Sequence, residues 1–94
     1  MKTISIIVPS YNSCRTIGRT LESLRPRLSE EKILELIVVD SSDDRQTRVL
    51  LKNYEKLEKI KIVLLEQKAI PALARNIGFE HATGDLLCFI DSDV

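Results

Sequence analysis

The chain has 94 residues, and its 14 Lys or Arg balance 14 Asp or Glu, so the formal net charge is zero. This length allows one domain with a thin core and is too short for two domains. A hydrophobic share of 44% with 30% charged residues excludes a disordered chain. Zero net charge argues against a nucleic-acid partner or an anionic membrane surface, because such binders need an excess of basic residues.

Cysteine content and apolar run length indicate the compartment. Cys14 and Cys88 are too few for a disulfide scaffold and are typical of reduced thiols in the cytosol. The first apolar run, residues 4–8, is shorter than the ~7–15 apolar residues of a signal peptide. No run approaches the ~18 apolar residues of a membrane span. We therefore expect a cytoplasmic protein.

Short apolar runs predict four strands, at residues 4–8, 34–39, 60–65 and 86–90. Their β-branched and apolar composition is typical of strands that are buried on both faces, as in a parallel sheet. Segments with helical spacing lie between them, which gives the order βαβαβαβ. Helical connections of this length imply right-handed crossovers and one parallel sheet, so we expect an α/β fold.

The three predicted helices each have one apolar face. Asn12–Ser13 would cap the first helix, and the charged residues 25–32 after it predict a loop. Pro71 suits the first turn of the third helix, and Gly84 is placed to end it. The residues expected to face the sheet are Ile17, Leu21, Leu24 and Leu28 in the first helix, Val49 or Leu50, Tyr54 and Leu57 in the second, and Leu73, Ala74, Ile77 and His81–Ala82 in the third.

Polar residues follow three of the predicted strands. Residues 9–12 come after the first strand, Asp40 after the second, and Asp91 and Asp93 after the fourth. In a parallel sheet these strand ends lie on one edge, and open α/β sheets bind ligands at that edge. The sequence therefore predicts a site there.

Asp91 and Asp93 are one residue apart at a strand end. Two such carboxylates can share Mg²⁺ or Mn²⁺, which typically bridge to phosphate oxygens. The same spacing also fits a solvated turn in which the Asp side chains cap their own backbone.

Asp40 has two interpretations as well. It could accept the imide N–H of a uracil or bind a ribose hydroxyl, or it could simply form the turn after its strand. Asp43 and Asp44, which follow it, are better explained as caps of the second helix.

Arg75 lies in the third helix, whose N-terminus should face the site, so it could bind phosphate oxygens; the alternative is a surface arginine. Tyr11 could stack on a base or cover the end of the sheet. His81 and Cys14 have no partner at a suitable spacing and are expected to be structural. Glycine-rich nucleotide loops, nucleophile elbows and CxxC zinc patterns are absent from the sequence.

Four motifs together resemble a known family. "ISIIVPSYN", "ELIVVDSSDD", "ALARNIGFEHATGD" and "LLCFIDSDV" are similar, in order and spacing, to the nucleotide-sugar-binding half of family 2 glycosyltransferases with the GT-A fold. The resemblance covers residues 4–94. It implies a Rossmann-like half of a GT-A fold with strand order 3-2-1-4, so that residues 1–94 form a single donor-binding half-domain.

The resemblance also implies a donor and a metal. The donor would be a nucleotide-diphosphate sugar, most often a UDP-sugar, with Mn²⁺ or Mg²⁺. The acceptor of the full-length parent would be a carbohydrate or a lipid-linked molecule, and many family members are membrane-associated. By position, Pro9, Ser10 and Tyr11 would line the nucleoside pocket, Asp40 would contact the base, Arg75 would reach the diphosphate, and Asp91 and Asp93 would form the DxD pair, with Asp91 nearer the ribose and Asp93 nearer the metal.

Two departures from the family pattern matter. The chain has Asp40-Ser41-Ser42-Asp43 where the family often has "DDGS". It also stops one residue after the DxD pair, whereas family members continue and carry the acceptor site and the catalytic base further on. We can name no general base in these residues, and we expect that this polypeptide alone does not transfer sugar.

The expected position of the fourth strand at the sheet edge predicts self-association. Its outer edge would be apolar and unpaired, so we expect a homodimer, or aggregation, through residues 85–91. Three other interpretations stay open: a haloacid-dehalogenase-type phosphatase, for "LLCFIDSDV"; a receiver-like domain, for the acidic strand ends; and a non-catalytic nucleotide-binding or interaction module, or an inert fragment.

Overall fold

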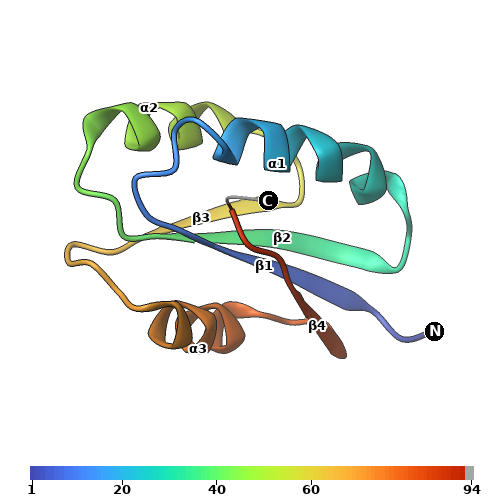
Figure 1. The fold of residues 1–94 in the computed structure, drawn as a ribbon. Coiled ribbons are helices and arrows are strands. Elements are labelled where there is room, and N and C mark those ends of the chain that lie inside the picture. The colour runs from blue at the N-terminus through green and yellow to red at the C-terminus, as the bar shows by residue number, and fades with distance from the viewer. Residues whose placement is uncertain (93–94) are drawn as a thin grey trace.

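The computed structural model describes residues 1–92. Four strands alternate with helices along the chain, as the sequence predicts (Figure 1). The strands are β1 (Ile4–Ser10), β2 (Ile33–Asp40), β3 (Ile60–Leu64) and β4 (Leu86–Phe89), and the helices are α1 (Ile17–Leu24), the 3-10 helix η1 (Arg25–Ser29), α2 (Arg45–Tyr54) and α3 (Pro71–His81).

The strands form one parallel sheet in the order β3-β2-β1-β4. This confirms the predicted α/β class and the 3-2-1-4 order. β1 pairs with β2 from Ile4–Ile33 to Ser10–Asp40, with a register shift after the first pair. Because β1 and β2 are the central strands, the residues that follow them lie side by side at the C-terminal edge of the sheet.

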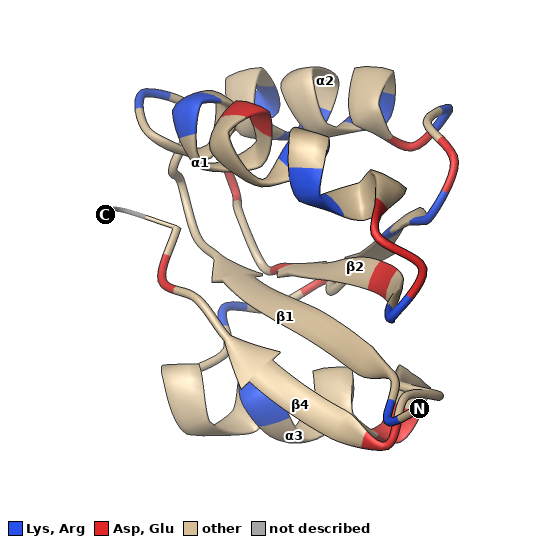
Figure 2. Cartoon of the chain, turned by 90° about the vertical axis from the view of Figure 1, so that its right-hand side faces the viewer, with Lys and Arg blue, Asp and Glu red and all other residues tan. Residues whose placement is uncertain are grey.

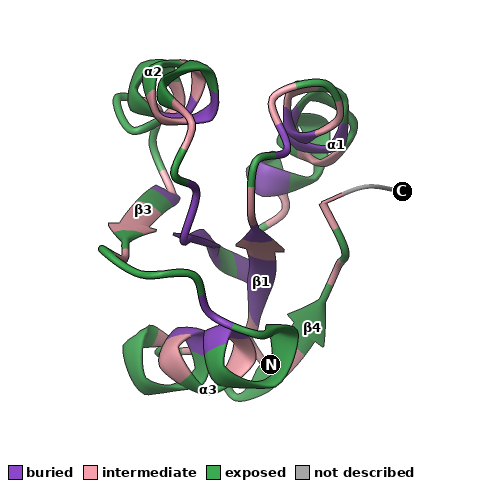
Figure 3. Ribbon diagram, turned by 60° about the vertical axis from the view of Figure 1, so that its left-hand side comes forward, coloured by how far each residue is buried: buried purple, intermediate pink, exposed green. Residues whose placement is uncertain are grey.

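Helices cover both faces of the sheet. Figures 1 and 3 show α1 and α2 on one face and α3 on the other. Ile6 and Val8 pack in the core under α1 and α2, whereas Ile7, Ile37 and Val39 pack in the core with α3. β1 and β4 carry no charged residue, and most charges lie on the helices and connections, apart from Glu35 and Asp40 in β2 and Lys61 in β3 (Figure 2). No helix within residues 1–92 has the length and apolar character that crossing a membrane would require.

The first helix differs from the prediction in its cap and in its end. Thr16 occupies the N-cap position without a side-chain bond, so the prediction that Asn12–Ser13 caps α1 through a side chain is wrong. The Ser13 carbonyl instead accepts bonds from the N–H groups of Thr16 and Ile17, at 2.9 and 2.8 Å. Residues 25–29, expected as loop, form η1, which begins at Arg25, has Pro26 in its first turn and buries Leu28.

The second and third helices confirm the starts predicted for them. Asp44 caps α2 by accepting from the Thr47 N–H at 2.8 Å, and Pro71 begins α3. The buried faces are partly different: Leu51 is fully buried on α2, whereas Val49 is 53% exposed. On α3, Ala74 and Gly78 are buried and Leu73, His81 and Phe79 are exposed.

The prediction that Gly84 ends α3 is also wrong. The helix ends at His81, and Ala82 follows it in an extended conformation. Gly84 instead lies against β1, where a Cβ atom would be 2.8 Å from the Ser5 backbone nitrogen. The glycine therefore permits a close approach of two backbone segments, and it has no positive φ.

Candidate functional site

A cavity of about 560 Å³ opens at the C-terminal edge of the sheet. Its volume falls in the range of small-molecule sites. The residues after β1, the start of α3 and the segment after β4 form its walls. Among its lining residues are five that the sequence singled out: Pro9, Ser10, Tyr11, Arg75 and Asp91.

The end of β1 forms the floor of the cavity and is fixed to the next strand. Ser10 is buried, and its hydroxyl oxygen lies 2.6 Å from that of Ser13. The Ser10 carbonyl accepts from the Ser41 N–H at 2.9 Å. Ser13 and Ser41 also line the cavity. The pair of buried hydroxyls and the backbone bond between Ser41 and Ser10 make this part of the cavity polar and join it to the residue after β2.

Asn12 joins the first connection to the second. It has a φ of 46°, a conformation that asparagine tolerates. Its amide nitrogen donates to Asp43 at 2.8 Å, and its amide oxygen accepts from the N–H groups of Asp43 and Asp44 at 3.0 and 3.1 Å. The Asn12 N–H donates to the Ser42 hydroxyl at 2.7 Å. These bonds place Tyr11, the preceding residue, at the mouth of the cavity.

Tyr11 donates its hydroxyl to Asp43 at 3.2 Å. The pKa of Tyr11 is raised. The largest cause is the loss of solvent around the ring, and the hydrogen bond to Asp43 and the charge of Asp43 add to it. The bonds from Asn12 and Tyr11 lower the pKa of Asp43. The phenol therefore stays neutral and the carboxylate stays charged near neutral pH, which keeps the ring of Tyr11 in a fixed orientation.

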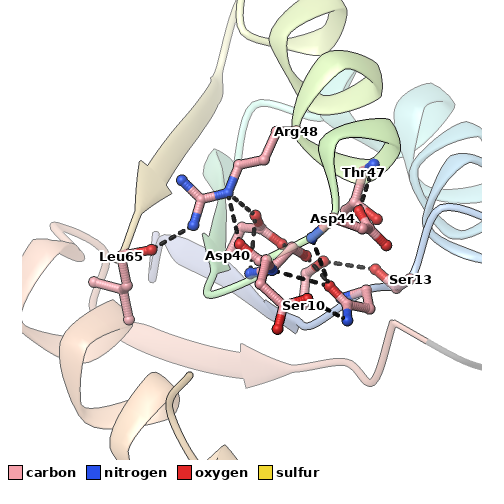
Figure 4. Close-up of polar contacts among 10 residues, drawn as sticks. Ser10, Ser13, Asp40, Asp44, Thr47, Arg48 and Leu65 are labelled. Carbon is pink, nitrogen blue, oxygen red and sulfur yellow. Dashed lines mark hydrogen bonds and ion pairs between the residues drawn. The ribbon is translucent and has the colours of Figure 1, made fainter. Parts of the chain in front are cut away.

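Asp40 is not among the residues that line the cavity, and Figure 4 shows it paired with Arg48. The carboxylate is fully buried, pairs with the Arg48 Nε at 2.9 Å and accepts from the Ser42 hydroxyl at 2.6 Å. Arg48 also donates to the carbonyls of Ser42 and Leu65. The contact of Asp40 with a base stays a prediction, and it requires neighbouring groups to move, because the carboxylate is fully buried.

Lys68 belongs to the cavity and was missed from the sequence. Its ammonium lies 4.5 Å from the centroid of the Tyr11 ring, a cation–π arrangement. Lys68 precedes Ala69 and Pro71, which also line the cavity. A basic residue just before a proline-started helix was the available signal, because that connection must pass the C-terminal edge of the sheet.

Arg75 is half-buried in the second turn of α3 and lines the cavity together with Ala74. The start of α3 also borders it through Pro71. A helix N-terminus attracts anions, and a guanidinium binds phosphate oxygens in pairs. Lys68, Arg75 and the helix start therefore give this side of the cavity a positive character.

Asp91 adds a carboxylate to the lining of the cavity. It follows β4, where the Ile90 N–H donates to the Ile7 carbonyl at 3.0 Å. Thr20 on α1 donates its hydroxyl to the Ser92 carbonyl at 3.2 Å. These two bonds hold Asp91 beside the cavity, where it is exposed. Asp93 lies outside the described residues.

The described carboxylates suit a metal that is bound jointly with a ligand. Within residues 1–92, no three His, Cys, Asp or Glu side chains gather in a group that could hold a metal ion by themselves. Mg²⁺ and Mn²⁺ need fewer protein ligands, since they commonly use one or two carboxylates with substrate phosphates and waters. Asp91, exposed at the cavity, fits that requirement.

Comparison with known proteins assigns the family. The sequence pattern of Glycosyl transferase family 2 matches residues 5–94. The chain therefore belongs to glycosyl transferase family 2, and its sheet is the Rossmann-like part of the GT-A fold. This confirms the family and the fold that the four motifs predict.

Similar proteins are glycosyltransferases from several microorganisms. A relative named for teichuronic acid biosynthesis, TuaG of Bacillus subtilis, is 38% identical over 91 residues, which are 96% of this chain and 35% of TuaG. Residues 1–349 of Staphylococcus aureus TarS, crystallised with UDP, match 97% of this chain and 27% of that one, with 33% identity and a TM-score of 0.80. The mannosyltransferase PcManGT of Pyrobaculum calidifontis, crystallised with GDP-Man and Mn²⁺, matches 98% of this chain and 28% of that one, with 28% identity and a TM-score of 0.79.

The chain spans about a third or less of the length of these relatives. What the comparisons establish is therefore the family and the fold of this part. The activity of the whole protein, its donor and its acceptor belong to the proposal that follows.

Proposed function

We propose that this chain is the donor-binding half-domain of a glycosyltransferase that binds a UDP-sugar with a divalent metal, for transfer to an acceptor hydroxyl. One observation carries this proposal. The cavity at the C-terminal edge of the sheet gathers Pro9, Ser10, Tyr11, Arg75 and Asp91, which the family resemblance assigns to the donor.

Each wall of the cavity has a suitable chemistry for one part of the donor. Tyr11 offers an aromatic face to the base, and the backbone at Pro9–Ser10 borders the nucleoside. Arg75 and the start of α3 attract the diphosphate. UDP is the preferred nucleotide because TarS, crystallised with UDP, is more similar in sequence to this chain than PcManGT, crystallised with GDP-Man.

Asp91, together with Asp93, would hold Mn²⁺ or Mg²⁺ against the diphosphate. The bound ion would neutralise negative charge on the departing diphosphate. Two hydrogen bonds hold the backbone on either side of Asp91. Thr20 donates to the Ser92 carbonyl, and the Ile90 N–H donates to the Ile7 carbonyl of β1. Arg75 adds a second positive charge that does not depend on the metal.

No described residue is assigned as the catalytic base, and the acceptor, a carbohydrate or a lipid-linked molecule, is proposed for the parent protein.

The two free cysteines, Cys14 and Cys88, suit a reducing compartment, and the cytoplasm is the proposed location. Pairing of two copies along the outer edge of β4 is part of the same proposal.

A titration of the isotopically labelled protein with UDP tests the proposal by NMR, with and without Mg²⁺ as a diamagnetic ion. We expect saturable shifts at Tyr11, Ser41 and Arg75, and tighter binding when Mg²⁺ is present. GDP should bind more weakly than UDP. A folded sample that shows no saturable shift with either nucleotide would overturn the proposal and leave an inert or non-catalytic module.

Three variants make the titration specific. Arg75→Met should weaken UDP binding about 10-fold by removing a charge-assisted contact, and should leave uridine binding unchanged. Asp91→Asn should reduce the gain from Mg²⁺. Arg45→Met, at an exposed arginine on α2 that does not line this cavity, is the matched control and should change neither.

A further inference from the structure

The side chains of Lys68 and Tyr11 contact each other at the cavity. The Lys68 ammonium lies 4.5 Å from the centroid of the Tyr11 ring, and both residues line the same cavity. We propose that Lys68 covers the base-binding face of Tyr11 in the free protein, and that an incoming base displaces it toward the phosphates. This inference rests on the proposed function, because it assigns a role in binding of the same nucleotide.

The backbone around Lys68 is anchored on both sides. The Leu65 N–H donates to the Asp40 carbonyl at 2.8 Å, and the Leu65 carbonyl accepts from Arg48 (Figure 4). On the other side Ala69 is buried, and the Ile70 carbonyl accepts the first helical bond of α3 from Ala74 at 3.0 Å. A displacement therefore involves the Lys68 side chain and not the whole connection.

The Lys68 side chain itself is free to move. It is exposed, and within residues 1–92 no hydrogen bond or ion pair holds its ammonium group. What attracts it is the ring of Tyr11 and the nearby charge of Asp43, whose pKa it helps to lower. An exposed cation–π contact is weaker than the stacking of a base on an aromatic ring. A base can therefore replace the ammonium on Tyr11.

The displaced ammonium has a second partner only when the ligand carries phosphates. Lys68 and Arg75 line the same cavity, and two cations in one cavity repel each other in the absence of an anion. A diphosphate between them removes that repulsion and gains a charge-assisted contact from Lys68. Breaking the contact between Lys68 and Tyr11 therefore weakens the binding of a nucleoside. For a nucleotide, the new contact between Lys68 and the diphosphate offsets this cost.

This arrangement predicts effects of opposite sign for two ligands that share a base. Lys68→Met keeps most of the length of the side chain and removes its charge. The variant should bind uridine about 2- to 5-fold more tightly, because no cation–π contact has to break. It should bind UDP more weakly, because the contact with the diphosphate is lost.

Calorimetric or NMR titrations of uridine and UDP, all in EDTA so that no metal contributes, test this prediction. Lys52→Met, at an exposed lysine on α2 outside this cavity, is the control and should alter neither affinity. A direct readout is the ε-methylene signal of Lys68, which the ring current of Tyr11 should shift upfield. It should move downfield on addition of uridine, and in Tyr11→Leu it should lie downfield from the start.

The outcomes separate this inference from the proposed function. Suppose that the wild type binds UDP and that Lys68→Met lowers the affinity for both ligands, raises it for both or changes neither. The proposed displacement of Lys68 is then wrong, while the donor site stands. If the wild type binds neither uridine nor UDP, and UDP fails to bind when Mg²⁺ is added as well, the proposed function fails and this inference fails with it. Opposite signs for the two ligands support the inference.

Discussion

Two buried carboxylates hold the two ends of β2. Asp40, at the C-terminal end, pairs with Arg48 from α2 at 2.9 Å, and Glu35, near the start, pairs with Lys61 from β3 at 2.6 Å. Asp40 fixes the connections that frame the cavity. Glu35 also accepts from the Ser5 hydroxyl and from Thr83, which ties β1 and the connection before β4 together. A buried carboxylate with several donors is stabilised in its charged form.

Glu35 should make the stability of the protein sensitive to acid. Burial alone would raise its pKa, but hydrogen bonds from Lys61, Ser5 and Thr83 outweigh burial and lower the pKa from 4.5 to about 2. As the pH falls, the folded state therefore binds a proton at Glu35 only at a lower pH than the unfolded state does. The contribution of Glu35 to the free energy of unfolding is complete above pH 4.5 and is lost as the pH falls toward 2.

Urea unfolding between pH 7 and pH 2 measures this contribution. At pH 7, Glu35→Gln should lower the free energy of unfolding by about 2 kcal/mol, because the charge-assisted bonds are lost. The difference from the wild type should shrink as the pH falls toward 2. Glu55→Gln, at an exposed glutamate after α2, should stay within about 0.5 kcal/mol of the wild type. A gap that stays constant over the whole pH range would contradict this origin.

At the scale of elements, Gly78 sets how closely α3 approaches the sheet. A Cβ atom at this position would lie 2.4 Å from Cγ2 of Ile7, a buried residue of β1. Alanine favours helices over glycine, yet Gly78→Ala should destabilise the protein by about 1–3 kcal/mol, since the helix or Ile7 must shift. Because α3 also carries Arg75, the variant should weaken UDP binding as well.

Gly18 in α1 provides the matched comparison for Gly78. A Cβ atom there would meet only Leu50 Cδ2 at 3.7 Å, an ordinary contact. Gly18→Ala should therefore leave the free energy of unfolding unchanged or raise it by up to about 1 kcal/mol. Thermal and urea unfolding of both variants measure the difference. Equal effects of the two substitutions would show that the close approach of α3 does not limit packing.

Local sequence signals predicted the elements better than their contacts. The strand runs, Pro71 at the start of α3 and the Asp44 cap follow from local sequence, and all three are confirmed. The buried face of α2 depends on how the helix rotates against the sheet. Leu50, Tyr54 and Leu57 pack against the core as predicted, whereas the alternative Val49 is exposed and the buried Leu51 was missed. Arg48 could not be paired with Asp40 from sequence, because the partner of a buried carboxylate is set by tertiary packing.

The candidate site shows the same division. Strand topology alone predicted that Pro9, Tyr11 and Asp91 meet at one edge of the sheet, and the cavity gathers them there. Lys68 was missed because its position depends on the path of the connection between β3 and α3. That path is fixed by Asp40 and Arg48, two residues that lie far from Lys68 in the sequence.

At the scale of the whole molecule, the two edge strands of the sheet differ. β3 carries the charged Lys61, and α2 packs beside it. β4 has no charged residue, and no strand within residues 1–92 pairs with its outer edge. Leu86, Cys88 and Phe89 are exposed on it. Charged residues on edge strands oppose pairing with a second chain, and β4 lacks that protection.

The 94-residue polypeptide should therefore associate with a second copy along β4. In the presence of a reductant, which prevents a disulfide between Cys88 thiols, analytical ultracentrifugation should show a dimer that dissociates on dilution. Cys88→Lys places a charge on the exposed part of β4 and should shift the equilibrium to monomer at the same concentration. Val49→Lys, at an exposed apolar residue of α2, controls for added charge and should leave the dimer intact. Loss of the dimer in Cys88→Lys alone would locate the contact on β4. The β4 edge does not drive association if the wild type stays monomeric at high concentration, or if Cys88→Lys associates as strongly as the wild type.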